Sequence, residues 1–392
     1  MDEYLSPAAT LPEDGCRGTL VGRIWLPGQP AGPAVVAIRD DGVYDLTPLV
    51  PTMSELCNAP DPVTLARSPA AKRLGELAPI LRNSRWDRRD PQRPWLLAPV
   101  DLQAIKAAGV TFAKSMLERV VEEQTKGDPG QAPAVRQRLE GIVGADLKAV
   151  RPGSDAARRL KEHLVAQGAW SQYLEVGIGT DAEIFTKAQP MSAVGHGAEV
   201  GILPASSWNN PEPELVLVVS AAGRIVGATL GNDVNLRDVE GRSALLLGKA
   251  KDNNASAGLG PFIRLVDGSF GLDAMRSAEV ELQVAGEDGF HMTATSSMRE
   301  ISRDVEELVR QATGPHHAYP DGFVLYCGTM FAPTVDRGAP GLGFTHHPGD
   351  LVTIGSPRLG TLANRVAHCT AIAPWQFGAG ALMRNLSERG LL

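Results

Sequence analysis

The feature that most constrains this chain is an apolar run that begins directly after two closely spaced carboxylates. Glu212 and Glu214 stand at the start of the aliphatic run Leu215–Val219, and such a run is typical of a buried β-strand. Because alternate side chains of a strand leave the same face, both glutamates are expected on one face at the start of this strand. A third carboxylate, Asp233, follows a Gly-Asn pair a short distance along the chain.

Three carboxylates on neighbouring segments can form a metal site. Hard divalent cations such as Mg²⁺ take oxygen ligands, usually a few carboxylates with water or substrate in the remaining positions. The competing interpretation is that Glu212 and Glu214 are solvated at a strand start and that Asp233 is a turn residue, because short carboxylate motifs also occur by chance. These residues alone leave both interpretations open, so the surrounding motifs have to decide.

Length and composition limit the class of protein. A chain of 392 residues favours two or three structural units. With 43% hydrophobic and 21% charged residues it is an ordinary globular sequence, and no apolar run is long enough to cross a bilayer. The net charge of −7 argues against nucleic-acid and membrane partners, which need basic patches. With an acidic start and four widely spaced cysteines, we expect a cytoplasmic protein with reduced thiols.

The pattern along the chain predicts a mostly β protein with some helix, an α+β fold. Residues 19–25, 34–38 and 42–46 read as strands, so we predict a small β-rich N-terminal domain with its linker over residues 1–95. The second domain is expected over residues 96–392. Within it, helices are predicted over 134–145, 154–166 and 304–311, and short strands dominate from residue 173 onward.

The motifs around the carboxylates resemble those of the fumarylacetoacetate hydrolase family. In that family a Glu-x-Glu strand and the Asp of an Asn-Asp-x-x-x-Arg-Asp segment hold Mg²⁺ or Mn²⁺, which correspond here to 212–214 and 232–238. Other segments match in order: 183–187, Lys251 with Gly260-Pro261, 295–298, 328–329, 348–354 and 359–364. The resemblance implies a mixed β-roll or barrel-like catalytic domain, a helical lid over about 110–168, and the metal in the mouth of the shell.

The resemblance also implies roles for individual residues. It assigns the metal to Glu212, Glu214 and Asp233; substrate binding to Thr329, Gly328, Lys187 and Asn235; and catalysis to Lys251, Glu118 and Ser115. Lys251 fits the active-site lysine by its spacing to Gly260-Pro261, although Lys249 is close enough to confuse the register. It would serve as a base if burial and a nearby cation depress its pKa. Arg237 and Asp238 are expected to pair and orient Asp233, or else to form a plain surface ion pair.

The lid segment departs from the hydrolytic pattern of the family. Hydrolytic members show Gly-x-Asn-Tyr-x-x-His-x-x-Glu, whereas the position of that histidine is Ser115 here and the glutamate is retained as Glu118. A serine without a basic neighbour does not readily deprotonate water at neutral pH. The histidine pairs 316–317 and 346–347 are expected to be solvated and therefore do not replace the missing base.

Taken together, the motifs resemble the branch of the family that dehydrates 2-keto-3-deoxy-pentonates. The resemblance implies an Mg²⁺-dependent dehydratase that forms 2,5-dioxopentanoate in pentose catabolism, with Lys251 or Glu118 removing the C3 proton. The alternatives are a metal-dependent hydrolase of 2,4-diketo acids such as acylpyruvates, and a non-catalytic metal-binding relative. We also expect a homo-oligomer, a dimer or tetramer, whose partner molecule is a small 2-oxo acid.

Overall fold

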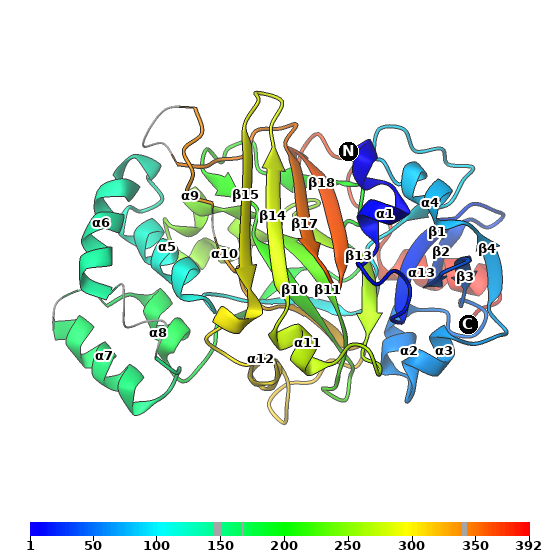
Figure 1. Ribbon diagram of the computed structural model, residues 1–392, viewed down its shortest axis with the longest axis horizontal. Coiled ribbons are helices and arrows are strands. Elements are labelled where there is room, and N and C mark those ends of the chain that lie inside the picture. Colours follow the sequence, from blue (N-terminus) through cyan, green and yellow to red (C-terminus); the bar gives the residue numbers. More distant parts are fainter. Residues whose placement is uncertain (144–149, 167, 169, 332, 339–342) are drawn as a thin grey trace.

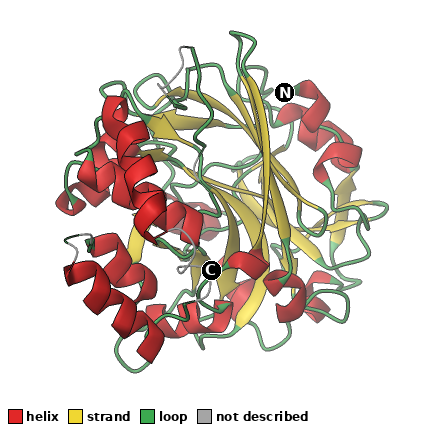
Figure 2. Ribbon diagram, turned by 60° about the vertical axis from the view of Figure 1, so that its left-hand side comes forward, coloured by secondary structure: helices red, strands yellow, loops and turns green. Residues whose placement is uncertain are grey.

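The chain is built around two large β-sheets, with helices on the outside (Figures 1 and 2). A computed structural model describes residues 1–143, 150–166, 168, 170–331, 333–338 and 343–392. Helices α5 (Ala113–Gln124), α6 (Ala132–Val143), α7 (Asp155–Ala166) and α8 (Gln172–Ile178) gather at one end of the molecule. The N-terminal strands, with the short helices that directly follow them, lie at the other end (Figure 1).

The larger sheet carries the predicted metal ligands at its centre. Its strands pair in the order β4 (Lys72–Gly75), β3 (Gly42–Asp45), β2 (Gly32–Arg39), β1 (Leu20–Leu26), β13 (Ala257–Leu265), β11 (Ile225–Asp233), β10 (Pro213–Val219), β16 (Phe323–Tyr326), β6 (Ala104–Ala108) and β7 (Ile184–Ala188), with β5 (Trp95–Leu96) on β1. The β16–β6 pair is parallel and the other pairs of this sheet are antiparallel. The predicted strands at 19–25, 34–38 and 42–46 are therefore confirmed as β1, β2 and β3.

The smaller sheets complete the β structure. One has the order β15 (His291–Ser297), β14 (Glu279–Ala285), β17 (Leu351–Ser356), β18 (Gly360–His368) and β8 (Glu199–Ile202), and the other pairs β12 (Asn235–Leu236) with β9 (Asn209–Asn210). Each strand order has two free ends, so these sheets do not close into a barrel. The mixed α+β architecture is confirmed, and the expected barrel-like shell is instead made of open sheets.

Strand β10 is apolar from Leu215 to Val219 because both of its faces are covered. Leu215, Leu217 and Val219 belong to the hydrophobic core that also contains residues of β14 and β17. Val216 and Val218 belong to a second core that includes the N-terminal strands. A strand buried on both faces reads as a continuous hydrophobic run rather than an alternating one, which explains the sequence pattern.

The helices are mostly short. They are α1 (Pro7–Thr10), α2 (Met53–Asn58), α3 (Pro62–Ala66), α4 (Leu77–Asn83), α5 (Ala113–Gln124), α6 (Ala132–Val143), α7 (Asp155–Ala166), α8 (Gln172–Ile178), α9 (Arg237–Glu240), α10 (Leu247–Lys251), α11 (Leu272–Arg276), α12 (Val305–Ala312) and α13 (Ala379–Glu388), with 3₁₀ turns at Asp2–Tyr4, Pro129–Gln131, Ala244–Leu246 and Met298–Glu300. The predicted helices at 134–145, 154–166 and 304–311 correspond to α6, α7 and α12. The predicted end of the first, at residues 144 and 145, lies outside the described residues.

The expectation that strands dominate with a single further helix after residue 173 is wrong, because α9, α10, α11 and α13 also lie there. The longest of these four is the C-terminal helix α13. It forms because Leu382, Asn385 and Leu386 are buried at helical spacing, and the side-chain amide of Asn385 donates to the carbonyl of Ala31 at 2.7 Å. This contact with the segment before β2 joins residues 354 positions apart. A helix stabilised by such a distant partner has only a weak signal of its own.

The N-terminal strands belong to the same sheet as the metal-ligand strands. β1 pairs with β13 through Leu20 and Val21, so the larger sheet runs continuously across the predicted boundary near residue 95. The division into residues 1–95 and 96–392 remains a prediction about independent folding units. No helix within the described residues has the length and apolar character needed to cross a membrane.

Candidate functional site

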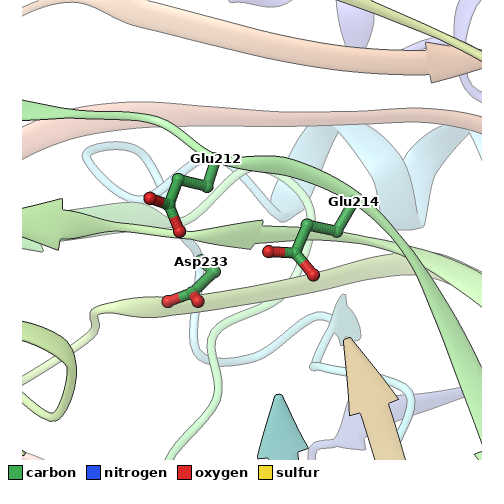
Figure 3. A group of neighbouring side chains, drawn as sticks. All are labelled: Glu212, Glu214 and Asp233. Carbon is green, nitrogen blue, oxygen red and sulfur yellow. The ribbon is translucent and has the colours of Figure 1, made fainter. Parts of the chain in front are cut away.

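The three predicted metal ligands converge at one end of the β10–β11 pair (Figure 3). Glu214 is paired with Gly231, and Asp233 ends β11. Glu212 immediately precedes β10, and its carbonyl accepts from the amide of Asp233 at 3.0 Å. One oxygen from each carboxylate lies within 4.8 Å of the others, and all three residues are buried.

Two lysines compensate the charge of this carboxylate trio. Lys251 Nζ lies 2.5 Å from Glu212 Oε2 and 3.0 Å from Asp233 Oδ2. Lys187 Nζ lies 3.0 Å from Asp233 Oδ1 and also donates to the backbone carbonyls of Val234 and Lys251. Lys249 is exposed, so the lysine beside the carboxylates is Lys251, as its spacing to Gly260-Pro261 predicted.

The arrangement shifts the pKa values of its members in opposite directions. Burial, and then the charges of Asp233 and Glu212, raise the pKa of Glu214 well above its usual value. Burial opposes ionisation of Asp233, but Lys187 and Lys251 lower its pKa overall. Burial likewise opposes the charge of Lys251, but Asp233 and Glu212 raise its pKa. The depressed pKa expected for a lysine base is therefore absent here, because anionic neighbours outweigh burial.

The donor set fits a hard divalent cation. Glu214 receives one hydrogen bond, from the amide of Gly328 at 2.7 Å, and none of the ion pairs found for the described residues includes it. A buried carboxylate without a cation is costly, and the raised pKa of Glu214 expresses that cost. Mg²⁺ would supply the missing positive charge, with Glu212, Glu214 and Asp233 as its oxygen ligands.

Helix α5, in the segment predicted to form the lid, lies against this site through a chain of ion pairs. Glu118 is bound by Arg237 at 2.7 Å and by Arg136 Nε at 2.7 Å. Arg119 contacts Glu212 directly and Glu122 at 2.5 Å. Burial opposes ionisation of Glu118, but hydrogen bonds and charges from Arg136 and Arg237 lower its pKa overall. The carboxylate of Glu118 is thus held by two arginines.

Sequence reasoning missed Arg119 and Glu122 as members of the site. Both are buried, with side chains 6% and 0% exposed. Their spacing of three residues in a helical segment was the available signal, because side chains at i and i+3 share one face of a helix. The Arg119–Glu122 pair differs from a surface ion pair because it is buried and faces the carboxylate trio. Only the fold shows this burial and this direction.

Ser115 and Thr329 are buried, and their hydroxyls donate to nearby backbone. Ser115 Oγ donates to the carbonyl of Phe112 at 2.9 Å, within its own helix. Thr329 Oγ1 donates to the carbonyl of Phe331 at 2.9 Å. The amide of Gly328 contacts Glu214, so the 328–329 turn does reach the carboxylate trio. The roles assigned to these three residues remain predictions.

Asn235 lies fully buried on β12, opposite Asn210 of β9. Neither polar atom of the Asn235 side chain has a hydrogen-bond partner within the described part of the chain. A buried amide left unpaired costs free energy, so Asn235 is suited to hold a polar molecule, in keeping with its predicted role.

The expected pairing of Arg237 with Asp238 is wrong. Arg237 is directed to Glu118 and Glu122 of the lid helix. Asp238 instead accepts from Ser206 Oγ at 2.7 Å and from the amide of Ser207 at 2.9 Å. Successive residues of a helical turn point in directions about 100° apart, which separates the two side chains.

The histidine pairs behave differently from each other. His316 and His317 are exposed, as expected. In the second pair His347 is exposed, but His346 is buried and its Nδ1 lies 3.0 Å from Asp350 Oδ2, so the expectation of a solvated pair is wrong for His346. Burial lowers the pKa of His346, and the Asp350 carboxylate provides the partner that a buried imidazole requires. No ion pair between a histidine and the carboxylate trio occurs in the described ranges.

A cavity of about 380 Å³ lies beside the lid helix. Its walls come from α5, α6, β15 and the segment after Thr329, and they include the Glu118–Arg136 pair among mainly apolar side chains. The carboxylate trio does not itself line this cavity within the described residues. Glu118 is thus the predicted catalytic residue that a molecule in the cavity would contact.

Comparison with known proteins finds similar sequences and a similar fold. The chain is 30% identical to a 2-dehydro-3-deoxy-D-arabinonate dehydratase of Saccharolobus solfataricus over 184 residues. These aligned residues make up 47% of this chain and 58% of that protein. It is 27% identical to a "Probable 2-keto-3-deoxyxylonate dehydratase" of Haloferax volcanii, over 85% of this chain and 94% of that protein. The fold resembles that of a 2-keto-3-deoxy-D-arabinonate dehydratase structure complexed with magnesium and 2,5-dioxopentanoate, with a TM-score of 0.59, 19% identity, and coverage of 89% of this chain and 99% of that one.

A family model described as fumarylacetoacetate (FAA) hydrolase C-terminal matches residues 157–367. The match includes the three carboxylates, Lys187, Lys251 and the 328–329 turn, and it spans more than half of the 392 residues. It begins after the lid helix α5. The chain therefore belongs to the fumarylacetoacetate hydrolase family.

Proposed function

We propose that this protein is an Mg²⁺-dependent dehydratase that converts a 2-keto-3-deoxy-D-pentonate into 2,5-dioxopentanoate in pentose catabolism. The observation that carries the proposal is a buried carboxylate trio contacted by Lys251, beside a lid helix that offers Glu118 but no histidine. The names of the two dehydratases similar in sequence, and the magnesium and 2,5-dioxopentanoate in the solved structure of similar fold, support the same reaction class.

Mg²⁺ held by Glu212, Glu214 and Asp233 would act as a Lewis acid that polarises the 2-oxo group and makes the C3 protons more acidic. The protein then has to place a base and an acid. Dehydration breaks one C3–H bond and the C4–O bond, and the C4 hydroxyl leaves as water after receiving a proton. Proton shifts from C5 convert the resulting unsaturated 2-oxo acid into the aldehyde.

The side chains divide these tasks by their charge. Glu118 is a carboxylate in the wall of the cavity, so we assign to it the role of accepting the C3 proton. Lys251 is an ammonium group between two carboxylates, so it is placed to donate a proton or stabilise developing negative charge. Asn235 and the 328–329 turn would bind the polar groups of the substrate. With this division, the proposed base is Glu118 rather than Lys251.

Hydrolysis of a carbon–carbon bond is a weaker alternative. It requires a base that activates water, and Ser115 donates its hydroxyl to a helix carbonyl. Among the described residues, the imidazole of His196 forms hydrogen bonds with Tyr4, Thr10 and Ala363, and the imidazole of His346 with Asp350. Neither imidazole is directed to the trio.

The reaction itself provides the first test. With Mg²⁺ and racemic 2-keto-3-deoxy-pentonate, the protein should form an aldehyde that a dehydrogenase oxidises to 2-oxoglutarate, whereas acylpyruvates should remain intact. In deuterated water the five-carbon skeleton is preserved and deuterium appears beside the new carbonyl. Pyruvate as the main product would refute the dehydratase assignment in favour of a hydrolase or a carbon–carbon lyase.

Isotope exchange separates the base from the acid. If Glu118 removes the C3 proton, Glu118→Gln should abolish exchange of C3 hydrogen with deuterated water as well as product formation. Lys251→Met should retain C3 exchange while losing most of kcat for elimination. The opposite pattern would reverse the two roles, and a large effect of Lys249→Met would show that the wrong lysine was chosen.

A further inference from the structure

Arg119 is a buried cation that contacts three carboxylates at once. Its Nη1 lies 2.5 Å from Glu122 Oε2 and 3.2 Å from Glu240 Oε2. Its Nη2 contacts Glu212 Oε1. Only arginine presents a rigid planar fork of donors that can satisfy several carboxylates in fixed directions. Arg119 thus joins the lid helix α5 to one of the three predicted metal ligands.

Glu122 extends this connection to a second arginine. Its other oxygen, Oε1, accepts from Arg237 Nε at 2.7 Å. Arg237 also donates to the carbonyl of Pro333 at 3.2 Å and lies over the Trp208 ring at 4.2 Å. The pair Arg119 and Glu122 is therefore held by α9 and by the segment that follows the 328–329 turn, so its position is fixed by the surrounding fold.

The two oxygens of Glu212 are held from two sides. Arg119 contacts Oε1 from the lid helix, and Lys251 contacts Oε2 from α10. We propose that Arg119 is a positioning residue that fixes the Glu212 carboxylate for the cation, so that cation binding depends on docking of α5. This inference rests on the proposed metal-dependent function, and its test uses binding of the cation rather than turnover.

A positioning role and a purely electrostatic role of Arg119 predict opposite changes in cation affinity when the side chain is removed. If Arg119 acted only as a nearby positive charge, its removal would relieve repulsion and strengthen cation binding. If it fixes the ligand, its removal lets Glu212 move and weakens binding. Groups that orient metal ligands typically contribute a factor of roughly 10–100 in metal affinity.

The experiment compares Arg119→Met with Lys114→Met. Lys114 is exposed on the same helix, so its replacement removes the same charge without touching the trio. Mn²⁺ alone is titrated into the full-length protein, and free Mn²⁺ is measured by electron paramagnetic resonance. We expect Arg119→Met to weaken Mn²⁺ binding by roughly 10–100-fold, and Lys114→Met to bind like the wild type. Equal or tighter binding by a folded Arg119→Met variant would overturn the proposal.

Glu122→Gln tests the same idea with less disturbance. It preserves the shape of the side chain and does not touch the trio, but it weakens the hold on Arg119. We expect Glu122→Gln to lose less Mn²⁺ affinity than Arg119→Met. In the wild type Mn²⁺ should slow hydrogen exchange of the α5 amides, and in Glu122→Gln it should no longer do so. Wild-type affinity and wild-type exchange in Glu122→Gln would overturn the proposal even if Arg119→Met did not fold. Failure of the wild-type protein to bind Mn²⁺ would instead refute the metal site itself.

Discussion

Gly328→Ala should disable the carboxylate trio without removing any of its side chains. Gly328 has φ +96°, and a Cβ there would lie 2.1 Å from Thr111 Oγ1. Ordinary contact begins at 3.4 Å, so the Thr111 hydroxyl would have to leave its 2.6 Å hydrogen bond to the carbonyl of Cys327. The alternative is that residue 328 moves, which breaks the bond from its amide to Glu214.

The expected size of this effect follows from two contributions. A left-handed conformation costs a residue with a Cβ about 1–2 kcal/mol. A hydrogen bond to a charged group contributes about 1.5–3 kcal/mol. The strain is present with and without the cation and therefore lowers the stability of the fold. Loss of the hydrogen bond, at about 1.5–3 kcal/mol, corresponds to roughly 10–100-fold weaker cation binding at about 1.4 kcal/mol per tenfold.

The assay is a titration of Mn²⁺ into folded Gly328→Ala, with circular dichroism and Tm as measures of folding. Thr111→Ala is the matched control, because it removes the clashing hydroxyl while keeping glycine at 328. The double variant Thr111→Ala, Gly328→Ala should recover part of the affinity, since the strained φ remains but the closest contact is gone. Wild-type affinity and Tm in Gly328→Ala would refute the reasoning.

Three further predictions concern the site and the sheet. Asp233→Asn removes a charged ligand, so turnover should fall by at least about 10²-fold with little change in Tm, and full wild-type activity after exhaustive chelation would contradict the metal role. Ser115→Ala should change kcat by less than about tenfold, because the Ser115 hydroxyl already serves a helix carbonyl; a loss comparable to that of Lys251→Met would show that Ser115 is catalytic. Burial opposes ionisation of Asp267, but hydrogen bonds from Ser269 and Thr19 lower the pKa of Asp267 to about 2 from 3.8. The ionised Asp267 therefore stabilises the fold fully above about pH 4, and this stabilisation is lost as the pH falls through about 2. Asp267→Asn should therefore lower the free energy of unfolding in urea by about 2 kcal/mol at pH 7, and a difference that stays constant down to pH 2 would refute this account.

Local pattern and family motifs were sufficient to predict the carboxylate trio. The apolar run after Glu214 predicted strand β10, and the spacing of Glu212 and Glu214 predicted that both carboxylates would point to one side, although Glu212 itself immediately precedes the strand. The first three N-terminal strands and the helices near 134, 154 and 304 were also predictable, because alternation and helical periodicity are properties of short segments. Lys251 could be distinguished from Lys249 only through the family spacing.

The tertiary structure determined which charged side chains form ion pairs. Arg119 lies 93 residues from Glu212, and Arg237 lies 115 residues from Glu122, so no local pattern reveals either pair. The same reason explains why Asp238 binds Ser206 rather than its neighbour Arg237, and why His346 is buried on Asp350. Strand alternation and helical periodicity are properties of nearby sequence. The burial of a residue and its interaction partner depend instead on how distant strands and helices pack, and that packing determines the chemistry of an ionisable side chain.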